Sequence, residues 1–148
     1  MEAVDAEAVR PLRREVLRPG QPAEQLVYDG DESPETLHAA VVQEGRIVGV
    51  VSIMRDGHPR TPRPGDWRIR GMASSPSRRG EGIGTALLDR CLAHAREHCG
   101  RRIWCNARVH ARTLYERAGF IVEGEQYEIP TIGAHYLMAR ELNGDQMV

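Results

Sequence analysis

The chain has 148 residues and a net charge of −1 at pH 7, with 41% apolar and 28% charged residues. These values are typical of one globular domain with a single core, so residues 1–148 are treated as one domain. The balanced charge argues against nucleic acid as a partner, and no apolar run approaches the roughly 20 residues of a membrane helix.

The N-terminal segment and the cysteines indicate the compartment. MEAVDAEAVR lacks the basic start and the apolar core of a signal peptide. The cysteines, Cys91, Cys99 and Cys105, are too few and odd in number for a disulfide framework. We therefore expect a cytoplasmic protein with reduced thiols.

The first half of the chain predicts one helix followed by strands. Apolar residues at helical spacing predict an amphipathic helix over about 5–17, which the RPGQP segment (18–22) ends. An acidic turn (29–35) precedes two β-rich runs that are joined by a hairpin at Glu44-Gly45. Strands are predicted over 37–43, 46–54, 67–73, 102–107, 120–127 and 134–142.

Two further helices are predicted between the later strands. One follows a glycine-rich turn and ends at about His98, and the other covers 110–118, with Gly119 as its C-cap. A Pro- and Gly-rich loop covers 56–66. Because helices fall between strands, the sequence predicts an α+β fold, in which helices flank a mixed sheet.

The stretch RRGEGIGTALLDR (78–90) leads directly from glycines into a helix. Glycine permits positive φ and lets a ligand approach the backbone closely. A helix N-terminus adds unpaired N–H groups and the positive end of the helix dipole. Because Arg78 and Arg79 add bidentate donors, this turn is predicted to bind a phosphate group.

Two common phosphate-binding motifs fit this turn poorly. A P-loop requires a lysine, and every basic residue of this chain is arginine. The dinucleotide fingerprint requires a glycine where Thr85 stands, and an acidic residue after the following strand. A nucleotide-binding protein of another fold and a tight turn without a ligand stay as alternatives.

The same segment resembles the signature of the GCN5-related N-acetyltransferases, the GNAT family. RGEGIG (79–84), followed by TALL, is similar to the family's R-x-x-G-x-G/A loop, and MASSP (72–76) is similar to the strand end that precedes it. LYERAGF (114–120) is similar to the family's LYEKxGF segment. The resemblance covers about residues 30–142.

Four further positions or segments resemble the ElaA-like branch of this family. They are Asp31, His38, Gly133–His135 and Met138–Glu141. Membership implies a single GNAT-like domain with a mostly antiparallel central sheet and helices on both faces. It also implies acetyl-coenzyme A as the co-substrate and an amine of a small molecule or a protein as the acceptor.

The resemblance implies how the coenzyme is held. The strands at 67–73 and 102–107 would splay apart as a V, with pantetheine between them and the pyrophosphate on the glycine turn. Many members of the family have Asn where this chain has Arg108, so this contact departs from the family's pattern. The implied coenzyme-binding residues are Met72, Ala73, Ser74, Arg78, Arg79, Gly80, Glu81, Gly82, Ile83, Gly84, Thr85, Arg108 and Arg112.

The resemblance implies Tyr115 as the general acid that protonates the coenzyme A thiolate. A phenol has suitable acidity and can reach the thiolate from a helix. Without the resemblance, a half-buried aromatic residue is the simpler interpretation of this position. The general base stays open between His38, His110, His135 and ordered water, because histidine titrates near neutral pH.

Other clusters favour structural roles. Cys91, His94 and His98 share one side of a helix, but Cys91 and Cys99 belong to its apolar stripe, so we predict core packing and no metal. A non-catalytic acyl-coenzyme A sensor is the alternative function, and a homodimer is possible by analogy with such families.

Two charged clusters are also interpreted as surface features. Arg68 and Arg70 alternate on one strand, and ion pairs on an exposed face are preferred over contact with an acidic part of a substrate. A solvated turn is likewise preferred for the acidic cluster of Asp29, Asp31, Glu32 and Glu35.

Overall fold

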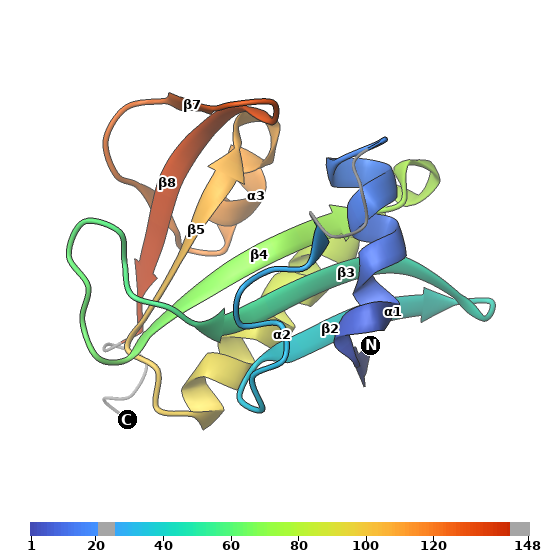
Figure 1. Cartoon of the computed structure of the whole chain (residues 1–148), viewed down its shortest axis with the longest axis horizontal. Coiled ribbons are helices and arrows are strands. Elements are labelled where there is room, and N and C mark those ends of the chain that lie inside the picture. The colour runs from blue at the N-terminus through green and yellow to red at the C-terminus, as the bar shows by residue number, and fades with distance from the viewer. Residues whose placement is uncertain (21–25, 143–148) are drawn as a thin grey trace.

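The computed structural model describes residues 1–20 and 26–142, which form one eight-stranded sheet (Figure 1). The strand order is β1-β2-β3-β4-β5-β8-β6, and β7 also pairs with β8. Among these pairings only that of β4 with β5 is parallel. The strands are β1 (Glu2–Val4), β2 (Leu37–Gln43), β3 (Arg46–Arg55), β4 (Asp66–Ser74), β5 (Arg102–Arg108), β6 (Ile121–Val122), β7 (Tyr127–Ile129) and β8 (Gly133–Glu141).

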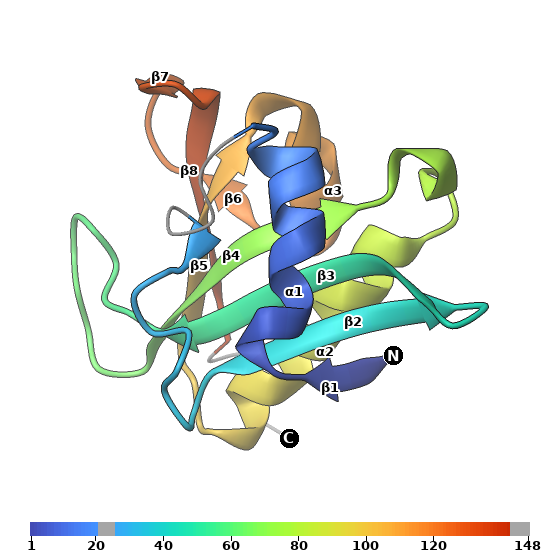
Figure 2. The same ribbon diagram turned by 45° about the vertical axis from the view of Figure 1, so that its right-hand side comes forward.

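Helices cover both faces of the sheet, as Figure 2 shows for α1 (Ala6–Leu12) and α2 (Ile83–Glu97). The short α3 (Arg112–Arg117) follows β5. The apolar stripe of α2 packs on the sheet around the wholly buried Trp67. The predicted α+β fold with a mostly antiparallel sheet is therefore confirmed. In the described part of the chain, no helix is long and apolar enough to cross a membrane.

The predicted N-terminal helix is confirmed, but its second half has a different geometry. Asp5 caps α1 by accepting a hydrogen bond from the Ala8 N–H at 3.2 Å. After α1 the chain widens into a π-helical turn, Arg13–Leu17, in which Arg13 is wholly buried. The segment predicted to end the helix, 18–22, lies partly outside the described residues.

A buried polar network holds this π-helical turn to the sheet. The Arg13 guanidinium donates to both carboxylate oxygens of Asp31, at 3.0 and 3.1 Å, and to the Ser52 hydroxyl at 2.7 Å. His38 Nε2 donates to the Asp31 carbonyl at 2.9 Å, so its Nδ1 accepts from the Ser52 hydroxyl at 2.6 Å. The prediction of a solvated turn is wrong for Asp31, because its cationic partner lies 18 residues earlier in the chain.

A second buried ion pair fixes the point where β4 and β5 meet. The two strands pair over only three positions, from Asp66–Arg102 to Arg68–Trp104. At the first pair, Arg102 donates to both Asp66 oxygens, at 2.8 and 2.9 Å. Beyond Arg68 the strands diverge (Figure 1), and β5 pairs with β8 instead. The V-shaped splay that the resemblance implied is confirmed.

A β-bulge at Gly71 changes the side-chain alternation of β4. Arg70 lies opposite Ser52, whereas Ala73 lies opposite Val50, so β4 contains one extra residue here. Gly71 has a φ of +64°, and a Cβ at this position would lie 2.7 Å from the Nε of Arg13. Glycine is therefore required for both the backbone conformation and the space.

The remaining predictions differ in detail from the structure. The hairpin at Glu44-Gly45 is confirmed, with positive φ at both residues as in a type I′ turn. The strand predicted over 120–127 is instead two short strands, β6 and β7, separated by a turn with positive φ at Gly124. β1 was not predicted. The core position predicted for Cys99 is wrong, because α2 has ended and Cys99 is exposed with a φ of +57°.

We expect Asp31→Asn to lower the free energy of unfolding by about 3–5 kcal/mol, because it leaves the buried Arg13 charge without its carboxylate. Urea denaturation measures this change. The matched control is Glu35→Gln, which removes the ion pair with Arg55 at the surface, where the side chains are 48% and 44% exposed. This control should cost no more than about 0.5 kcal/mol.

The same variant should change the acid dependence of stability. Burial alone would raise the pKa of Asp31, but hydrogen bonds from Arg13 and the Tyr28 N–H outweigh burial and hold that pKa below 3.8. A lowered folded-state pKa stabilises the protein above the unfolded pKa, near 3.9, and this contribution disappears as pH falls through the folded pKa. Wild type should therefore lose more stability than Asp31→Asn below about pH 4. Parallel pH profiles of the two proteins would contradict this role.

Candidate active site

The diverging strands β4 and β5 border a cleft of about 770 Å³, which extends from the start of α2 to Tyr28. Most of the residues predicted from the sequence meet here, although they come from elements that are far apart in the chain. The exceptions are Glu81, Arg112 and His38. The predicted residues that line the cleft are Met72, Ala73, Ser74, Arg78, Arg79, Gly80, Gly82, Ile83, Gly84, Thr85, Arg108, His110, Tyr115 and His135.

One end of the cleft is the glycine turn before α2. Gly80 and Gly82 have φ values of +88° and +79°, and a Cβ on either would meet no atom within 4 Å. Gly82 is the N-cap of α2, so no side chain caps this helix, and its first turn contains no acidic residue. The first N–H groups of α2 and the positive end of its dipole are therefore available to an anion in the cleft.

Two of the implied coenzyme-binding side chains have other partners. Glu81 lies 3.9 Å from the guanidinium of Arg78, in an exposed ion pair. Arg112 pairs with Glu116 at 3.3 Å, and its guanidinium lies 4.9 Å from the ring centre of Tyr136. The contacts of Arg112 are thus on α3 and β8 rather than in the cleft.

The edge of β4 forms the middle of the cleft. From Ile69 to Ser74 this strand has no β5 partner, because the two strands have diverged. Met72, Ala73 and Ser74 line the cleft along this edge. A ligand with amide groups could add to β4 here in the manner of an extra strand.

Tyr115 lies in the cleft wall with only 4% of its surface exposed. Its ring packs edge-on against Phe120, with 5.4 Å between ring centres. Burial raises the pKa of Tyr115 well above 10, and the neighbouring Cys105 and Cys91 raise it further, in part through a hydrogen bond with Cys105. The phenol therefore carries its proton at neutral pH.

The three candidate histidines differ in their surroundings. His38 belongs to the buried network of Arg13, and His110 is exposed at the cleft. His135 is buried in the cleft wall, where its Nδ1–H donates to the Gly133 carbonyl at 2.7 Å, so Nε2 is the acceptor nitrogen. Burial, assisted by the charge of Arg108, lowers the pKa of His135 below 6.5. His135 is thus neutral at pH 7 and has the form of a base.

Sequence reasoning missed the far end of the cleft. Tyr28 and Asn106 line it, and Asn106 accepts a hydrogen bond from the Tyr127 hydroxyl. Arg70 was expected on an exposed face, but it is half-buried in the cleft over the ring of Tyr28. The isolated Gly71 within a strand pattern was the available signal, because such a glycine often marks a bulge near a site.

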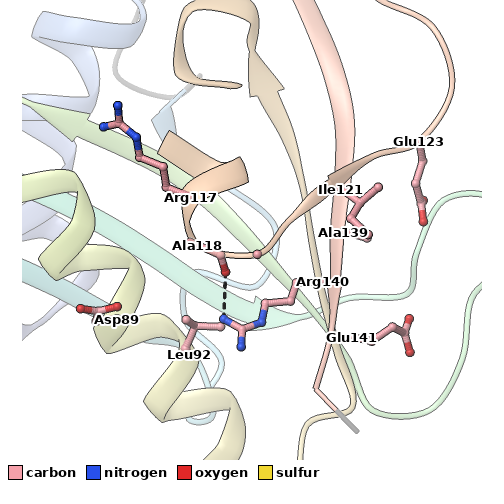
Figure 3. Close-up of a pocket in the computed structure, with 10 residues that line it drawn as sticks. Asp89, Leu92, Arg117, Ala118, Ile121, Glu123, Ala139, Arg140 and Glu141 are labelled. Carbon is pink, nitrogen blue, oxygen red and sulfur yellow. Dashed lines mark hydrogen bonds between the residues drawn. The ribbon is translucent and has the colours of Figure 1, made fainter. Parts of the chain in front are cut away.

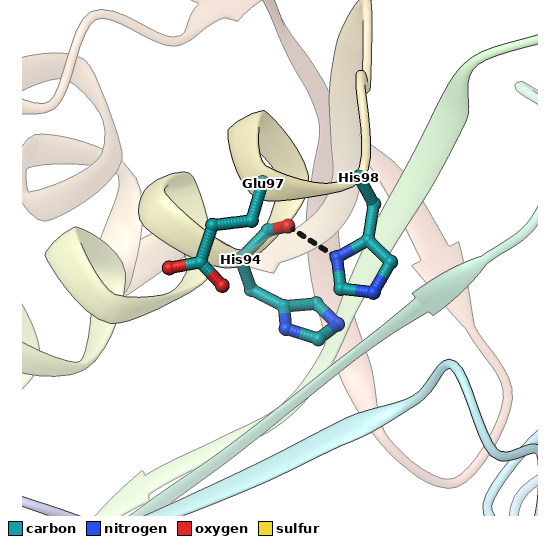
Figure 4. Close-up of side chains that lie close together, drawn as sticks. All are labelled: His94, Glu97 and His98. Atoms are coloured by element: carbon teal, nitrogen blue, oxygen red, sulfur yellow. Dashed lines mark hydrogen bonds between the residues drawn. The ribbon is translucent and has the colours of Figure 1, made fainter.

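His94, Glu97 and His98 lie together near the end of α2 (Figure 4), and one ligand atom from each lies within 4.8 Å of the others. His94 Nε2 donates to the Glu35 carbonyl at 2.8 Å, and His98 Nδ1 donates to the His94 carbonyl at 2.9 Å. Each ring thus has one acceptor nitrogen left. Cys91, considered with these histidines, is wholly buried in the core as predicted.

A second hollow, of about 710 Å³, lies between α2 and β8 (Figure 3). Both signs of charge line it, including Asp89, Glu141 and Arg140, whose Nη1 donates to the Ala118 carbonyl at 2.8 Å. Residues 117–119, at the C-terminal and therefore negative end of α3, also border it. This hollow suits a phosphate less well than the glycine turn does.

Comparison with known proteins gives a consistent result. The model of the acetyltransferase (GNAT) family matches residues 4–120. The chain is 29% identical over 142 residues to YitI of Bacillus subtilis, an uncharacterised N-acetyltransferase, covering 96% of this chain and 95% of that protein. Its fold is similar to that of Escherichia coli ElaA, with a TM-score of 0.77, 21% identity and coverage of 95% and 97%.

Another similar structure is that of an aminoglycoside 6′-N-acetyltransferase complexed with coenzyme A. The TM-score is 0.70 at 17% identity, and the match covers 96% of this chain and 97% of that chain. The resemblance inferred from the sequence motifs is therefore confirmed.

The surroundings of His135 predict how it titrates. Its pKa, measured by NMR from the shift of the ring proton with pH, should lie below the ordinary value of 6.5. Arg108→Gln should raise this pKa, because it removes a nearby positive charge that disfavours the imidazolium. Arg46→Gln, in the exposed hairpin, should leave it unchanged. A wild-type pKa above 6.5 would exclude the buried neutral form.

Proposed function

The chain belongs to the acetyltransferase (GNAT) family, and on this premise we propose that it transfers an acetyl group from acetyl-coenzyme A to an amine. The observation that carries this proposal is the uncapped glycine turn of α2, which faces the gap between β4 and β5. A diphosphate and an amide-containing arm are the two parts of coenzyme A that such a turn and strand edge would bind.

The residues present fit this substrate. The N–H groups of the turn, from Gly80 to Thr85, would hold the pyrophosphate, with Arg78 and Arg79 as charged partners. The open space beside the α-carbons of Gly80 and Gly82 allows phosphate oxygens to approach the backbone. The edge of β4 between Ile69 and Ser74 would pair with the pantetheine amides and direct the thioester toward Tyr115.

Tyr115 is proposed as the general acid. During transfer the new N–C bond forms as the C–S bond breaks, and the leaving sulfur must gain a proton. The position of the phenol in the cleft wall supports this role, because Tyr115 is protonated and lies where the thiolate would develop. Because Tyr115 is buried, water is excluded from its hydroxyl, and the proton can pass directly from the phenol to the thiolate.

His135 is proposed as the general base. The amine must lose one proton as it attacks, and the acceptor nitrogen Nε2 of the neutral His135 ring can take it. One proton thus enters His135 for each proton that leaves Tyr115. His38 is not suited to this role, because both of its ring nitrogens are engaged in the Arg13 network.

We expect Tyr115→Phe to lower kcat by about 100- to 10,000-fold while coenzyme A still binds, because only the acidic proton is lost. Chromatographic measurement of coenzyme A release is the suitable assay, because the exposed Cys99 would react with thiol reagents. The control is Tyr136→Phe, which removes a hydroxyl that contacts Gln126 at the surface. Equal kcat in wild type and Tyr115→Phe would remove Tyr115 from the mechanism.

Gly82→Ala should weaken the binding of coenzyme A, because the methyl group would enter the space where the diphosphate is proposed to lie. Gly45→Ala is a matched control, since Gly45 also has positive φ, +75°, and open space beside its α-carbon. Both variants should cost about 1 kcal/mol of stability through the backbone. Calorimetric titration should show weaker binding for Gly82→Ala alone. Equal affinities would argue against this turn as the diphosphate site.

A further inference from the structure

Away from the glycine turn, the cleft is lined by arginines from separate parts of the chain. Arg68 and Arg70 lie on β4, Arg108 ends β5, and Arg18 follows the N-terminal helix. The guanidinium carbon of Arg70 lies 4.1 Å from the ring centre of Tyr28, and that of Arg18 lies 5.6 Å from it. The fold thus gathers positive charge at the end of the cleft opposite the proposed diphosphate site.

Two other arginines of the fold, which are wholly or almost wholly buried, are paired with carboxylates. Arg13 and Arg102 each donate two hydrogen bonds to a carboxylate, that of Asp31 or Asp66. Among the residues that the structure describes, Arg70 has no such carboxylate partner, and none accepts a hydrogen bond from its guanidinium. A half-buried guanidinium without an anionic partner is costly, because it has lost water and gained no opposite charge.

Arg108 is in a similar position. It donates to the Leu17 carbonyl but has no carboxylate partner among the described residues. Arg68, by contrast, already pairs with Asp56 at 3.3 Å. Within residues 1–20 and 26–142, no Asp or Glu side chain lines the cleft. Arg70 and Arg108 are therefore the guanidinium groups best placed to meet an anion from outside the protein.

The electrostatics of this end of the cleft agree with the geometry. Burial, together with the positive charge of Arg68, lowers the pKa of Arg70 to about 10. Burial and the charge of Arg18 likewise lower the pKa of Arg108. An anion bound here would remove this repulsion. The same field disfavours an ammonium group, so it favours the neutral amine that acetyl transfer requires.

We propose that the acceptor is a small amine that also carries an anionic group, a carboxylate or a phosphate, which Arg70 and Arg108 bind. This inference rests on the proposed function and names its substrate class. Arg108 lies opposite His135 in the β5–β8 pairing, so one of the two anion-binding residues adjoins the proposed base. Arg70 and Arg108 both have Tyr28 and Arg18 as electrostatic neighbours, so the acceptor that we infer places its anion between them and its amine at His135. A polycationic amine lacks the anion and would add to the positive charge.

The test compares matched acceptors with and without the anion, with acetyl-coenzyme A as donor and with kcat/KM expressed per neutral amine. One arm pairs each common amino acid with its amide, and a second arm pairs phosphoethanolamine with ethanolamine. We expect kcat/KM to be about 10- to 100-fold higher for the anionic member, because its hydrogen bonds to guanidinium groups are charge-assisted. The arm that shows this preference distinguishes a carboxylate from a phosphate.

The variant Arg70→Met tests whether Arg70 binds the anion of the acceptor. In this variant kcat/KM for the anionic acceptor should fall by about 10- to 100-fold, and by much less for the neutral partner. Arg46→Met, in the exposed hairpin, is the matched control and should change neither value. Thermal unfolding of both variants verifies that they are folded. An equal loss for the anionic and neutral acceptors would show that Arg70 does not bind the anion.

The outcomes separate this inference from the proposed function. If neutral or cationic amines are acetylated as well as anionic ones, acetyl transfer stands and the anionic acceptor is excluded. If no acceptor in either arm is acetylated, the proposed function is contradicted. Calorimetric titration with the N-acetylated amino acids and with N-acetyl phosphoethanolamine then tests the anion site alone. If none of these anions binds to the wild-type protein, the inferred anion site is overturned as well.

Discussion

The ion pair between Arg102 and Asp66 fixes the vertex from which the cleft opens. It lies at the first of three paired positions between β4 and β5, the one parallel pairing among the described strands. β5 stays paired with β8 over its whole length but pairs with β4 only as far as Arg68–Trp104, so the edge of β4 from Ile69 onward has no β5 partner. The opening that admits a ligand is therefore a consequence of how the strands pair, rather than of a missing side chain.

A second constraint shapes the acceptor end. The buried Arg13–Asp31 pair and Ser52 hold the π-helical turn against the sheet. Gly71 makes this contact possible, because a side chain at the bulge would collide with Arg13. The bulge also puts Arg70 and Ala73 on the same face of β4, so that Arg70 lies over Tyr28. The buried arginines Arg13 and Arg102 thus pair with carboxylates of the protein, whereas Arg70 has no carboxylate partner among residues 1–20 and 26–142.

The two ends of the cleft differ in how well the sequence predicts them. The end that we propose for the diphosphate depends on Gly80, Gly82 and the start of α2, which are adjacent in the chain. Their effect comes from local backbone freedom and from the helix dipole, so a short motif is enough to predict it. The acceptor end joins Tyr28, Arg70 and Arg108, which are far apart in the chain. The alternation of Arg68 and Arg70 alone suggested a solvated face.

The sequence by itself determined the helices, most of the strands, the hairpin at Glu44-Gly45 and the glycine turn before α2. Each of these follows from residues within a few positions of one another, because hydrogen-bonding periods and φ preferences are local properties. Only the tertiary structure decided that Asp31 is buried, that Arg70 faces a cleft and that His135 rather than His38 has the surroundings of a base. These outcomes depend on partners brought together from distant segments, and burial, charge pairing and pKa are set by those partners.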